Sequence, residues 1–177
     1  VAAFPSGGSA YGALAGFTAN QAALEAAVLS IGTGGGNTPM SGAMVEAGRY
    51  FSTAISDTGA PGTAPTLACR KNFILLLSDG NPNGGAHTAD YECTGVPNVN
   101  VPAGQPWLGA QYNYDGPDIP CLVTGQQTLN TYTIGFGAPG SFSPATLQNI
   151  AASGGGQYFY ASNVDQLNVA FENIIFS

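Results

Sequence analysis

The chain has 177 residues and a net charge of −7, with ten acidic residues against three basic ones. This length is typical of one domain with a single hydrophobic core, and a hydrophobic content of 44% argues against disorder. The scarcity of lysine and arginine excludes a nucleic-acid-binding surface and a polybasic membrane anchor, because both need clusters of basic side chains.

Only 7% of the residues are charged, so the surface must be covered mainly by glycine, serine, threonine, asparagine and glutamine. Such a surface is more typical of a secreted or surface-assembled protein than of a cytosolic enzyme. No apolar run approaches the roughly 20 residues that span a bilayer. No signal peptide is visible at Val1–Phe4, so any export signal must have been removed or must lie upstream. We therefore expect an extracellular, cell-surface or pilus protein without a membrane span.

The N-terminal third predicts a short strand or hairpin and then two helices. Val1–Phe4 has the pattern of a strand end, and Ser9–Phe17 is compatible with a short edge strand or hairpin. Gln21–Ile31 follows N-cap residues and ends at a glycine run, which predicts a helix. The second helix runs from Pro39 to Phe51, with proline at the first helical position, where its missing N–H costs nothing. Inward-facing residues are expected at Ala22, Leu24, Ala27, Val28 and Ile31 of the first helix, and at Met40, Ala43, Met44, Ala47, Tyr50 and Phe51 of the second.

A run of five consecutive apolar residues, from Phe73 to Leu77, predicts a buried strand. The run is too short for a typical helix, and its bulky side chains favour a central strand that is covered on both faces. Asp79 and Gly80 follow at the carboxyl end of this strand, where open α/β sheets place their ligand sites. Asp79 is therefore a candidate ligand-binding residue.

The segment from Asn81 to about Gly125 shows no regular periodicity and predicts a long irregular insertion within the same domain. Loops of this length are unusual in compact domains and are often functional. Four aromatic residues lie in the insertion: Tyr91, Trp107, Tyr112 and Tyr114. They have two interpretations: they form a contact surface for a protein or glycan ligand, or they pack over the edge of the sheet.

Two of the three cysteines, Cys93 and Cys121, bracket a polar loop rich in proline and glycine. We expect a disulfide between them, which would stabilise the fold by about 3 to 4 kcal/mol on the chain-entropy model. Three cysteines and one histidine do not match a standard zinc spacing. Cys69 is then either a buried free thiol or a residue whose partner lies outside this sequence.

The C-terminal third predicts two strands that alternate with two helices. The strands are Leu129–Phe136 and Gln157–Ala161, and the helices are Ser143–Ala152 and Asn163–Phe176. Strands that alternate with helices predict an α/β fold with a doubly wound, mostly parallel sheet, in a single domain over residues 1–177. The last helix is amphipathic, with inward positions at Leu167, Ala170, Phe171, Ile174 and Ile175.

Two of these features together resemble the von Willebrand factor A (vWA) domain: a Gly-Gly-x-Thr loop before a helix, ending at Thr38, and a hydrophobic strand that ends in Asp79-Gly80. A narrower resemblance is to the type IV pilus tip adhesins of the PilC/PilY family. It rests on the block Asn37–Phe51, on Cys69–Phe73 with the following Ser-Asp-Gly, and on Ala152–Phe171. Together these blocks cover well over half the chain.

In vWA domains the threonine and the aspartate belong to a metal-ion-dependent adhesion site. The resemblance therefore implies that Thr38 and Asp79 are metal ligands that meet at one end of the sheet, with Mg²⁺ or Ca²⁺ as the cofactor. Both cations take oxygen ligands, which hydroxyl and carboxylate groups supply. The alternative is that Thr38 only caps its helix and Asp79 only a turn. An EF-hand-like spacing from Asp79 to Asp90 is a weaker calcium signal, because Pro82 interrupts it and no flanking helices are predicted.

The family's metal site begins with Asp-x-Ser-x-Ser at the end of the first, central strand, and this chain contains no such motif. We therefore expect a sheet that lacks this strand, and a metal site that residues outside the chain complete. We also expect the strand from Asn72 to Leu77 to be paired on both sides. Upstream sequence, a partner chain or a rearranged part of the insertion would supply the second neighbour.

The resemblance implies an adhesion or ligand-binding domain of a surface or pilus-tip protein, which binds a protein or glycan ligand or other pilus components. The alternative is a structural subunit of an extracellular filament that assembles through an open sheet edge. We do not expect an enzyme, because the single histidine, His87, lies among loop residues and no nucleophilic triad is visible.

Overall fold

The computed structural model of the protein describes residues 2–3, 12–13, 22, 25–26, 29, 38–53, 72–84, 87–89, 99–115 and 129–176. All three cysteines lie outside these ranges. The bond between Cys93 and Cys121 and the state of Cys69 therefore stay predictions.

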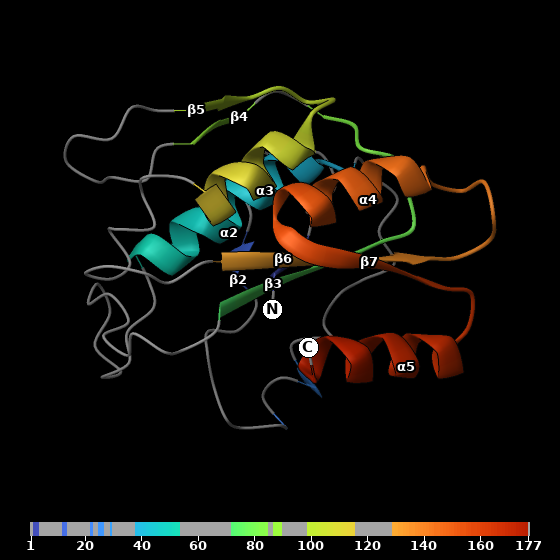
Figure 1. Ribbon diagram of the computed structural model, residues 1–177. Coiled ribbons are helices and arrows are strands. Elements are labelled where there is room, and N and C mark those ends of the chain that lie inside the picture. The colour runs from blue at the N-terminus through green and yellow to red at the C-terminus, as the bar shows by residue number, and fades with distance from the viewer. Residues whose placement is uncertain are drawn as a thin grey trace.

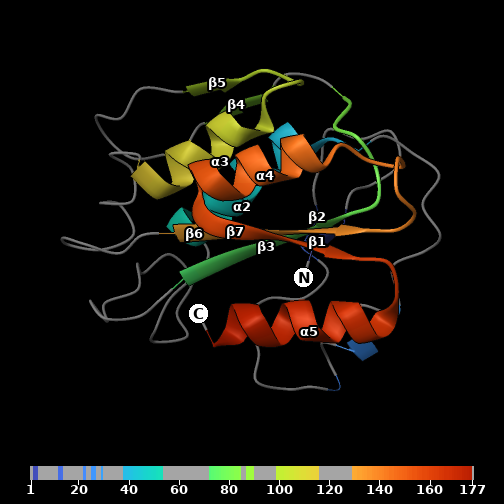
Figure 2. The same cartoon turned by 45° about the vertical axis from the view of Figure 1, so that its right-hand side comes forward.

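The protein has an α/β fold in which a small parallel sheet is flanked by helices on both faces (Figure 1). The sheet has three strands in the order β3 (Asn72–Ser78), β6 (Leu129–Phe136) and β7 (Gly155–Ala161). On one face lie the helices α2 (Met40–Thr53), α3 (Pro106–Asp115) and α4 (Pro144–Ser153), and on the other face lies α5 (Val164–Ile175), as the turned view in Figure 2 shows. The expectation of parallel strands alternating with helices is confirmed for this part of the chain.

The predicted boundaries of the C-terminal elements agree with the structure to within two residues. Strand β6 spans the predicted range, and α4 begins after the N-cap Ser143, whose hydroxyl accepts a hydrogen bond from the N–H of Thr146 at 3.4 Å. Helix α5 begins after Asn163, whose side chain accepts from the N–H of Gln166 at 3.0 Å. These caps satisfy N–H groups that the first turn of a helix leaves without partners, so the local sequence defines both helix starts.

Strand β7 begins two residues earlier than predicted, within the glycine run that ends α4. A Cβ atom added at Gly156 would lie 2.2 Å from the carbonyl oxygen of Thr131, which belongs to β6. Gly155 has a φ of 65°, in the left-handed region that favours glycine. The glycines therefore do more than end a helix, because they let β7 approach β6 where the register shifts, between Thr131 and Thr133.

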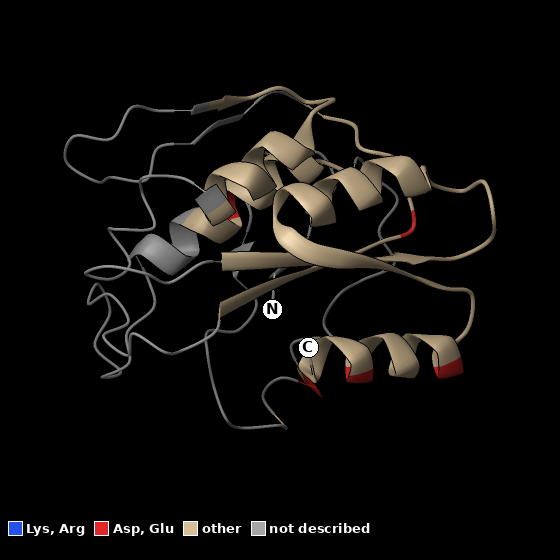
Figure 3. Ribbon diagram, viewed as in Figure 1, with Lys and Arg blue, Asp and Glu red and all other residues tan. Residues whose placement is uncertain are grey.

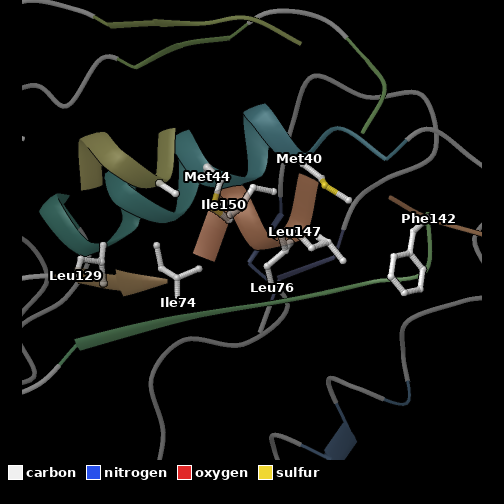
Figure 4. Packing of buried hydrophobic residues seen from close by; sticks show 9 residues of the cluster. Met40, Met44, Ile74, Leu76, Leu129, Phe142, Leu147 and Ile150 are labelled. Carbon is white, nitrogen blue, oxygen red and sulfur yellow. The ribbon is translucent and has the colours of Figure 1, made fainter. Parts of the chain in front are cut away.

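The main core lies between the sheet and the face that carries α2, α3 and α4. Met40 and Met44 of α2 point toward the strands, and Leu147 and Ile150 of α4 meet them there (Figure 4). These side chains are all at most 1% exposed. The full cluster comprises Met40, Met44, Ile74, Leu76, Ala110, Leu129, Phe142, Leu147 and Ile150.

A second cluster lies on the opposite face, where α5 packs against β6 and β7. Its buried members are Tyr132, Ile134, Ala161, Ala170 and Ile174. Leu167 and Phe171 pack against this cluster, as the amphipathic pattern predicts. Ile175 was expected to face inward too, but it is exposed, because it lies about 100° around the helix from Ile174 and so points away from the face that packs on the cluster.

The expectation that β3 is a central strand is wrong for the part of the chain that the structure describes. Within this part β3 pairs with β6 alone and forms an edge of the sheet. Its residues alternate between buried and exposed, with Ile74 and Leu76 in the main core. Phe73, Leu75 and Leu77 point to the other face and are 39%, 40% and 44% exposed. They remain exposed because α5 packs on β6 and β7, not on β3.

Part of the insertion, expected to be irregular, is regular structure. Strands β4 (His87–Ala89) and β5 (Val99–Val101) form an antiparallel pair, and helix α3 follows them. Side-chain hydrogen bonds join this region to α2: the Ser41 hydroxyl lies 2.7 Å from the carbonyl oxygen of Pro102 and 3.1 Å from that of Ala103, and the Asn113 amide donates to the carbonyl of Met44 at 2.8 Å. The sequence did not predict α3, because its glycine and asparagine residues are poor helix formers and its apolar residues follow no stripe.

Near the N-terminus, β1 (Ala2–Ala3) and β2 (Gly12–Ala13) pair with each other in antiparallel fashion, so strands are confirmed at both predicted positions, whereas their mutual pairing was not predicted. Four residues of the first predicted helix are described and all are helical: Ala22, Glu25, Ala26 and Leu29. Ala22 was expected to face inward, but it is exposed. The other inward positions of this helix lie outside the described residues.

Candidate functional site

The carboxyl ends of β3 and β6 lie side by side, because the two strands are parallel and pair Ser78 with Gly135. Asp79 follows β3 directly, and a tight loop from Gly137 to Ser141 follows β6. Loops at this end of a parallel sheet are the usual position of ligand sites in open α/β folds. The predicted site residue Asp79 therefore lies at the expected edge of the sheet.

The residues before α2 are held at the same edge by Asn83. The N–H of Asn83 donates to the carbonyl of Thr38 at 2.9 Å, and the N–H of Thr38 donates to the side-chain oxygen of Asn83. Gly84, with a φ of 109°, completes the contact, because a Cβ atom there would lie 3.1 Å from the Cβ atom of Pro39. Two hydrogen bonds between Thr38 and Asn83, one in each direction, thus connect the loop after β3 to the residues before α2.

This attachment brings Thr38 next to the residue that follows Asp79. A Cβ atom added at Gly80 would lie 3.0 Å from the hydroxyl oxygen of Thr38. Thr38 therefore lies beside the turn Asp79-Gly80 at the carboxyl end of the sheet, and a contact between the side chains of Thr38 and Asp79 stays a prediction. Thr38 is half-buried and Asp79 is exposed, so solvent and solutes reach this pair.

Ser141 is a third oxygen-bearing residue at this edge, and sequence reasoning missed it. A Cβ atom at Gly137 would lie 3.3 Å from the hydroxyl oxygen of Ser141 and 4.0 Å from the Cβ atom of Asp79. The Ser141 hydroxyl donates to the carbonyl of Ala138 at 2.9 Å and closes the turn. A hydroxyl that follows a second predicted parallel strand by a few residues is the signal that could have identified it.

The chemistry of this edge is that of hard oxygen donors without a full ligand set. Asp79 supplies a carboxylate, and Thr38 and Ser141 supply hydroxyl groups. Among the described residues, no three of histidine, cysteine, aspartate and glutamate come together in a way that could hold a metal ion. Figure 3 shows the acidic residues spread over the N-terminal helical segment, α2, the end of β3 and α5, with no lysine or arginine among the residues that it colours. Mg²⁺ takes about six oxygen ligands, several of them waters. The residues present fit such a cation in kind, but they are too few to hold it alone.

The predicted aromatic contact residues contribute to packing where the structure describes them. Trp107 packs against the main core, and Tyr112 packs against the buried pair Val45 and Val101. Tyr114 lies over Gly155, where an added Cβ atom would be 2.3 Å from the tyrosine ring. These contacts favour the packing alternative, with Trp107 and Tyr112 packed among helices and Tyr114 over the start of the edge strand β7.

A ligand-contact role for Trp107, Tyr112 and Tyr114 stays a prediction, and so does that of Tyr91, which lies outside the described residues. His87, expected in a loop, lies in β4, where it pairs with Val101.

Comparison with known proteins does not identify a family for this chain. No protein-family model matches the chain, and no curated protein matches it. One solved structure, of an uncharacterized membrane-spanning protein from Vibrio fischeri, is similar over 60% of this chain, with 24% sequence identity and a TM-score of 0.36. The matched part is 46% of that protein, so the chain spans less than half of its length.

Proposed function

We propose that the protein is an adhesion or ligand-binding domain of the vWA type, from a surface or pilus-tip protein of the PilC/PilY kind. The observation that supports this proposal is the position of Thr38 beside the turn Asp79-Gly80 at the carboxyl edge of the parallel sheet, where Asn83 holds Thr38 and Gly80 makes room for its hydroxyl. The sequence resemblance assigns these two residues to a metal-ion-dependent adhesion site.

The ligand set is incomplete, so residues outside the chain complete the site in this proposal. An Mg²⁺ or Ca²⁺ ion held by Thr38, Asp79 and these residues would retain an open coordination position. A carboxylate from a protein ligand or an oxygen from a glycan would occupy it, because both cations prefer oxygen donors. The positive end of α2, which begins two residues after Thr38, would add to the attraction for an anionic ligand group.

The proposal is tested by the effect of metal removal and of two substitutions on adhesion of the intact surface protein. Chelation with EDTA should abolish adhesion, and Mg²⁺ should restore it. Asp79→Asn should weaken adhesion by at least about tenfold, because it removes the carboxylate that would bind the cation directly. Thr38→Ala should have a smaller effect in the same direction. Mn²⁺ binding, followed by electron paramagnetic resonance, should decrease in parallel in both variants.

Asp165→Asn is the matched control, since Asp165 is an exposed acid in the first turn of α5, on the opposite face of the sheet. It removes the same charge from the chain and should leave adhesion and Mn²⁺ binding unchanged. Adhesion that resists EDTA, or that falls equally with both aspartate substitutions, would exclude the metal site.

A second candidate function, a structural subunit of an extracellular filament, is favoured by a separate observation. The outer edge of β3 has no strand partner among the described residues, and three large apolar side chains beside it are partly exposed. Open strand edges are sites at which other chains pair. The proposed partners are protein or glycan ligands or further subunits.

None of the described helices has the length and apolar character needed to cross a membrane.

A further inference from the structure

The loop after β3 contains two asparagines that differ in chemical reactivity. Asn83 is the one asparagine of the sequence that a glycine follows, whereas a proline follows Asn81. The backbone nitrogen of the next residue can attack an asparagine side chain, and glycine favours this attack because no Cβ atom crowds the reacting atoms. Proline prevents it, because its backbone nitrogen carries no hydrogen. Asn83 is therefore a candidate modification site, and Asn81 is its control within the same loop.

Asn83 and Gly84 are open to the water that this chemistry needs. Both residues are exposed, and both lie outside helices and strands. The attack requires rotation of the backbone between the two residues. Segments outside helices and strands open at a lower free energy than core elements do, because fewer backbone hydrogen bonds have to break. The loop after β3 therefore permits the rotation more easily than a strand or helix would.

The contact with Thr38 activates the side chain of Asn83. The N–H of Thr38 donates to the side-chain oxygen Oδ1 of Asn83. A donor on this oxygen makes the carbon Cγ more electrophilic and stabilises the negative charge that the oxygen gains during the attack, as in an oxyanion hole. The N–H of Asn83 donates to the carbonyl of Thr38 at 2.9 Å. This second bond lies on the other side of the Cα atom from Gly84, so it leaves the required rotation free.

We propose that Asn83 is a site of spontaneous deamidation, and that the aspartate formed there adds a carboxylate to the candidate cation site. The nitrogen of Gly84 forms a bond with Cγ of Asn83, the bond from Cγ to Nδ2 breaks, and the Gly84 proton leaves with Nδ2 as ammonia. Water then adds across one carbon–nitrogen bond of the cyclic imide and gives aspartate or isoaspartate. The reaction needs water alone as a co-reactant.

The aspartate product fits the place of the asparagine. A carboxylate oxygen can accept the same hydrogen bond from the N–H of Thr38, and a charged acceptor strengthens it. The positive end of α2 lies just beyond Thr38 and favours a negative charge there. Isoaspartate lengthens the main chain by one carbon, so it would displace Gly84 from Pro39, where an added Cβ atom would lie 3.1 Å away. The gain of a cation ligand rests on the proposed metal site at Asp79, whereas the deamidation itself does not.

Incubation of the full chain at mildly alkaline pH, followed by tandem mass spectrometry, tests the modification. A synthetic peptide with the sequence of residues 79–89 serves as the time reference. Asn83 should show the mass gain of deamidation, and Asn81 should not. Asn83→Gln should stay unmodified, because its longer side chain would have to close a larger ring. An Asn83 that is intact when the peptide has fully converted, or a mass gain at Asn81 instead, would overturn the proposal.

Mn²⁺ binding, followed by electron paramagnetic resonance, tests the effect on the site. Asn83→Asp should lower the Mn²⁺ dissociation constant by about tenfold, because affinity for hard cations rises with the number of charged oxygen ligands. Asn81→Asp is the matched control, since it adds the same charge to the same loop at another exposed position. It should change the constant by less than about twofold, because solvent and salt screen an exposed charge. An equal effect of both substitutions would overturn the added ligand.

Asp79→Asn separates this inference from the proposed function. It should weaken Mn²⁺ binding in the parent chain and in the Asn83→Asp variant. If it weakens binding in neither, the proposed metal site and the added ligand both fail, while a mass gain at Asn83 stands. If it weakens binding in the parent chain but Asn83→Asp does not strengthen it, the metal site stands and the role of the new carboxylate is overturned.

Discussion

Strands β3 and β6 are parallel neighbours in one sheet, yet their burial is very different. In β3 every second residue is exposed, while β6 is buried over five consecutive residues from Thr131 to Gly135. The more apolar strand is the less buried one, because β3 carries Phe-Ile-Leu-Leu-Leu at its centre and β6 carries two threonines and a glycine.

The difference follows from the neighbours of each strand. β6 lies between β3 and β7, and it contacts the main core on one face and the α5 cluster on the other. β3 has the main core on one face only. On its other face, Phe73 makes an edge-to-face contact with Tyr132 of β6, with the ring centroids 5.7 Å apart, and is otherwise partly open. An apolar strand thus indicates the capacity for burial on two faces, while its place in the sheet decides whether both faces are covered.

The comparison is tested most strongly by truncating one apolar residue in each strand. Ile134→Ala in β6 should lower the free energy of unfolding by about 2–5 kcal/mol, because this side chain is fully buried and its loss leaves a cavity. Leu75→Ala in β3 should cost only about 1 kcal/mol, because much of this side chain already contacts water. Urea denaturation at a protein concentration low enough to keep the chain monomeric measures both values. Equal losses would mean that Leu75 is covered in the monomer.

A second test compares two buried threonines of β6. The Thr133 hydroxyl donates to the carbonyl of Leu147 at 2.9 Å, whereas the Thr131 hydroxyl is buried with no hydrogen-bond partner among the described residues. Valine has nearly the same shape as threonine and removes only the hydroxyl. Thr133→Val should therefore destabilise the fold by about 1 kcal/mol, and Thr131→Val should stabilise it by a similar amount. A loss of stability in both variants would show that Thr131 has a partner.

The smallest expected effect concerns Tyr158 in β7, the other edge strand. Burial, and secondarily the neighbouring Tyr160, raises the pKa of Tyr158 above its ordinary value of 10.0. On unfolding, the tyrosine ionises at the lower, ordinary pKa, so the unfolded state loses its proton first as the pH rises. Stability from this group is therefore fully present below about pH 10 and declines above it.

Tyr158→Phe should reduce this alkaline loss of stability, as thermal unfolding at neutral pH and above pH 10 would show. An equal alkaline loss in the parent chain and in the variant would contradict the assignment to Tyr158.

Much of the candidate site could be predicted from local sequence. Asp79 follows an apolar run that is too short for a typical helix and favours a strand, and Thr38 precedes a helix with proline near its start, so both residues were expected at element ends. Ser141 was missed because it is fixed by a turn whose position depends on β6. Asn83 was not expected to fasten Thr38, because the two residues are 45 positions apart and their hydrogen bonds depend on how the loop lies against α2.

Outside the insertion, the sequence by itself determined the kinds of element and most of their bounds, since periodicity, caps and glycine runs act within a few residues. The starts of α4 and α5 at their capping residues and the range of β6 are such features. Only the tertiary structure decided that β6 is central, that β3 is an edge, and that residues 106–115 form a helix between α2 and α4. Each of these outcomes depends on which surfaces meet across long sequence separations, and a local pattern of apolar and polar residues does not contain that information.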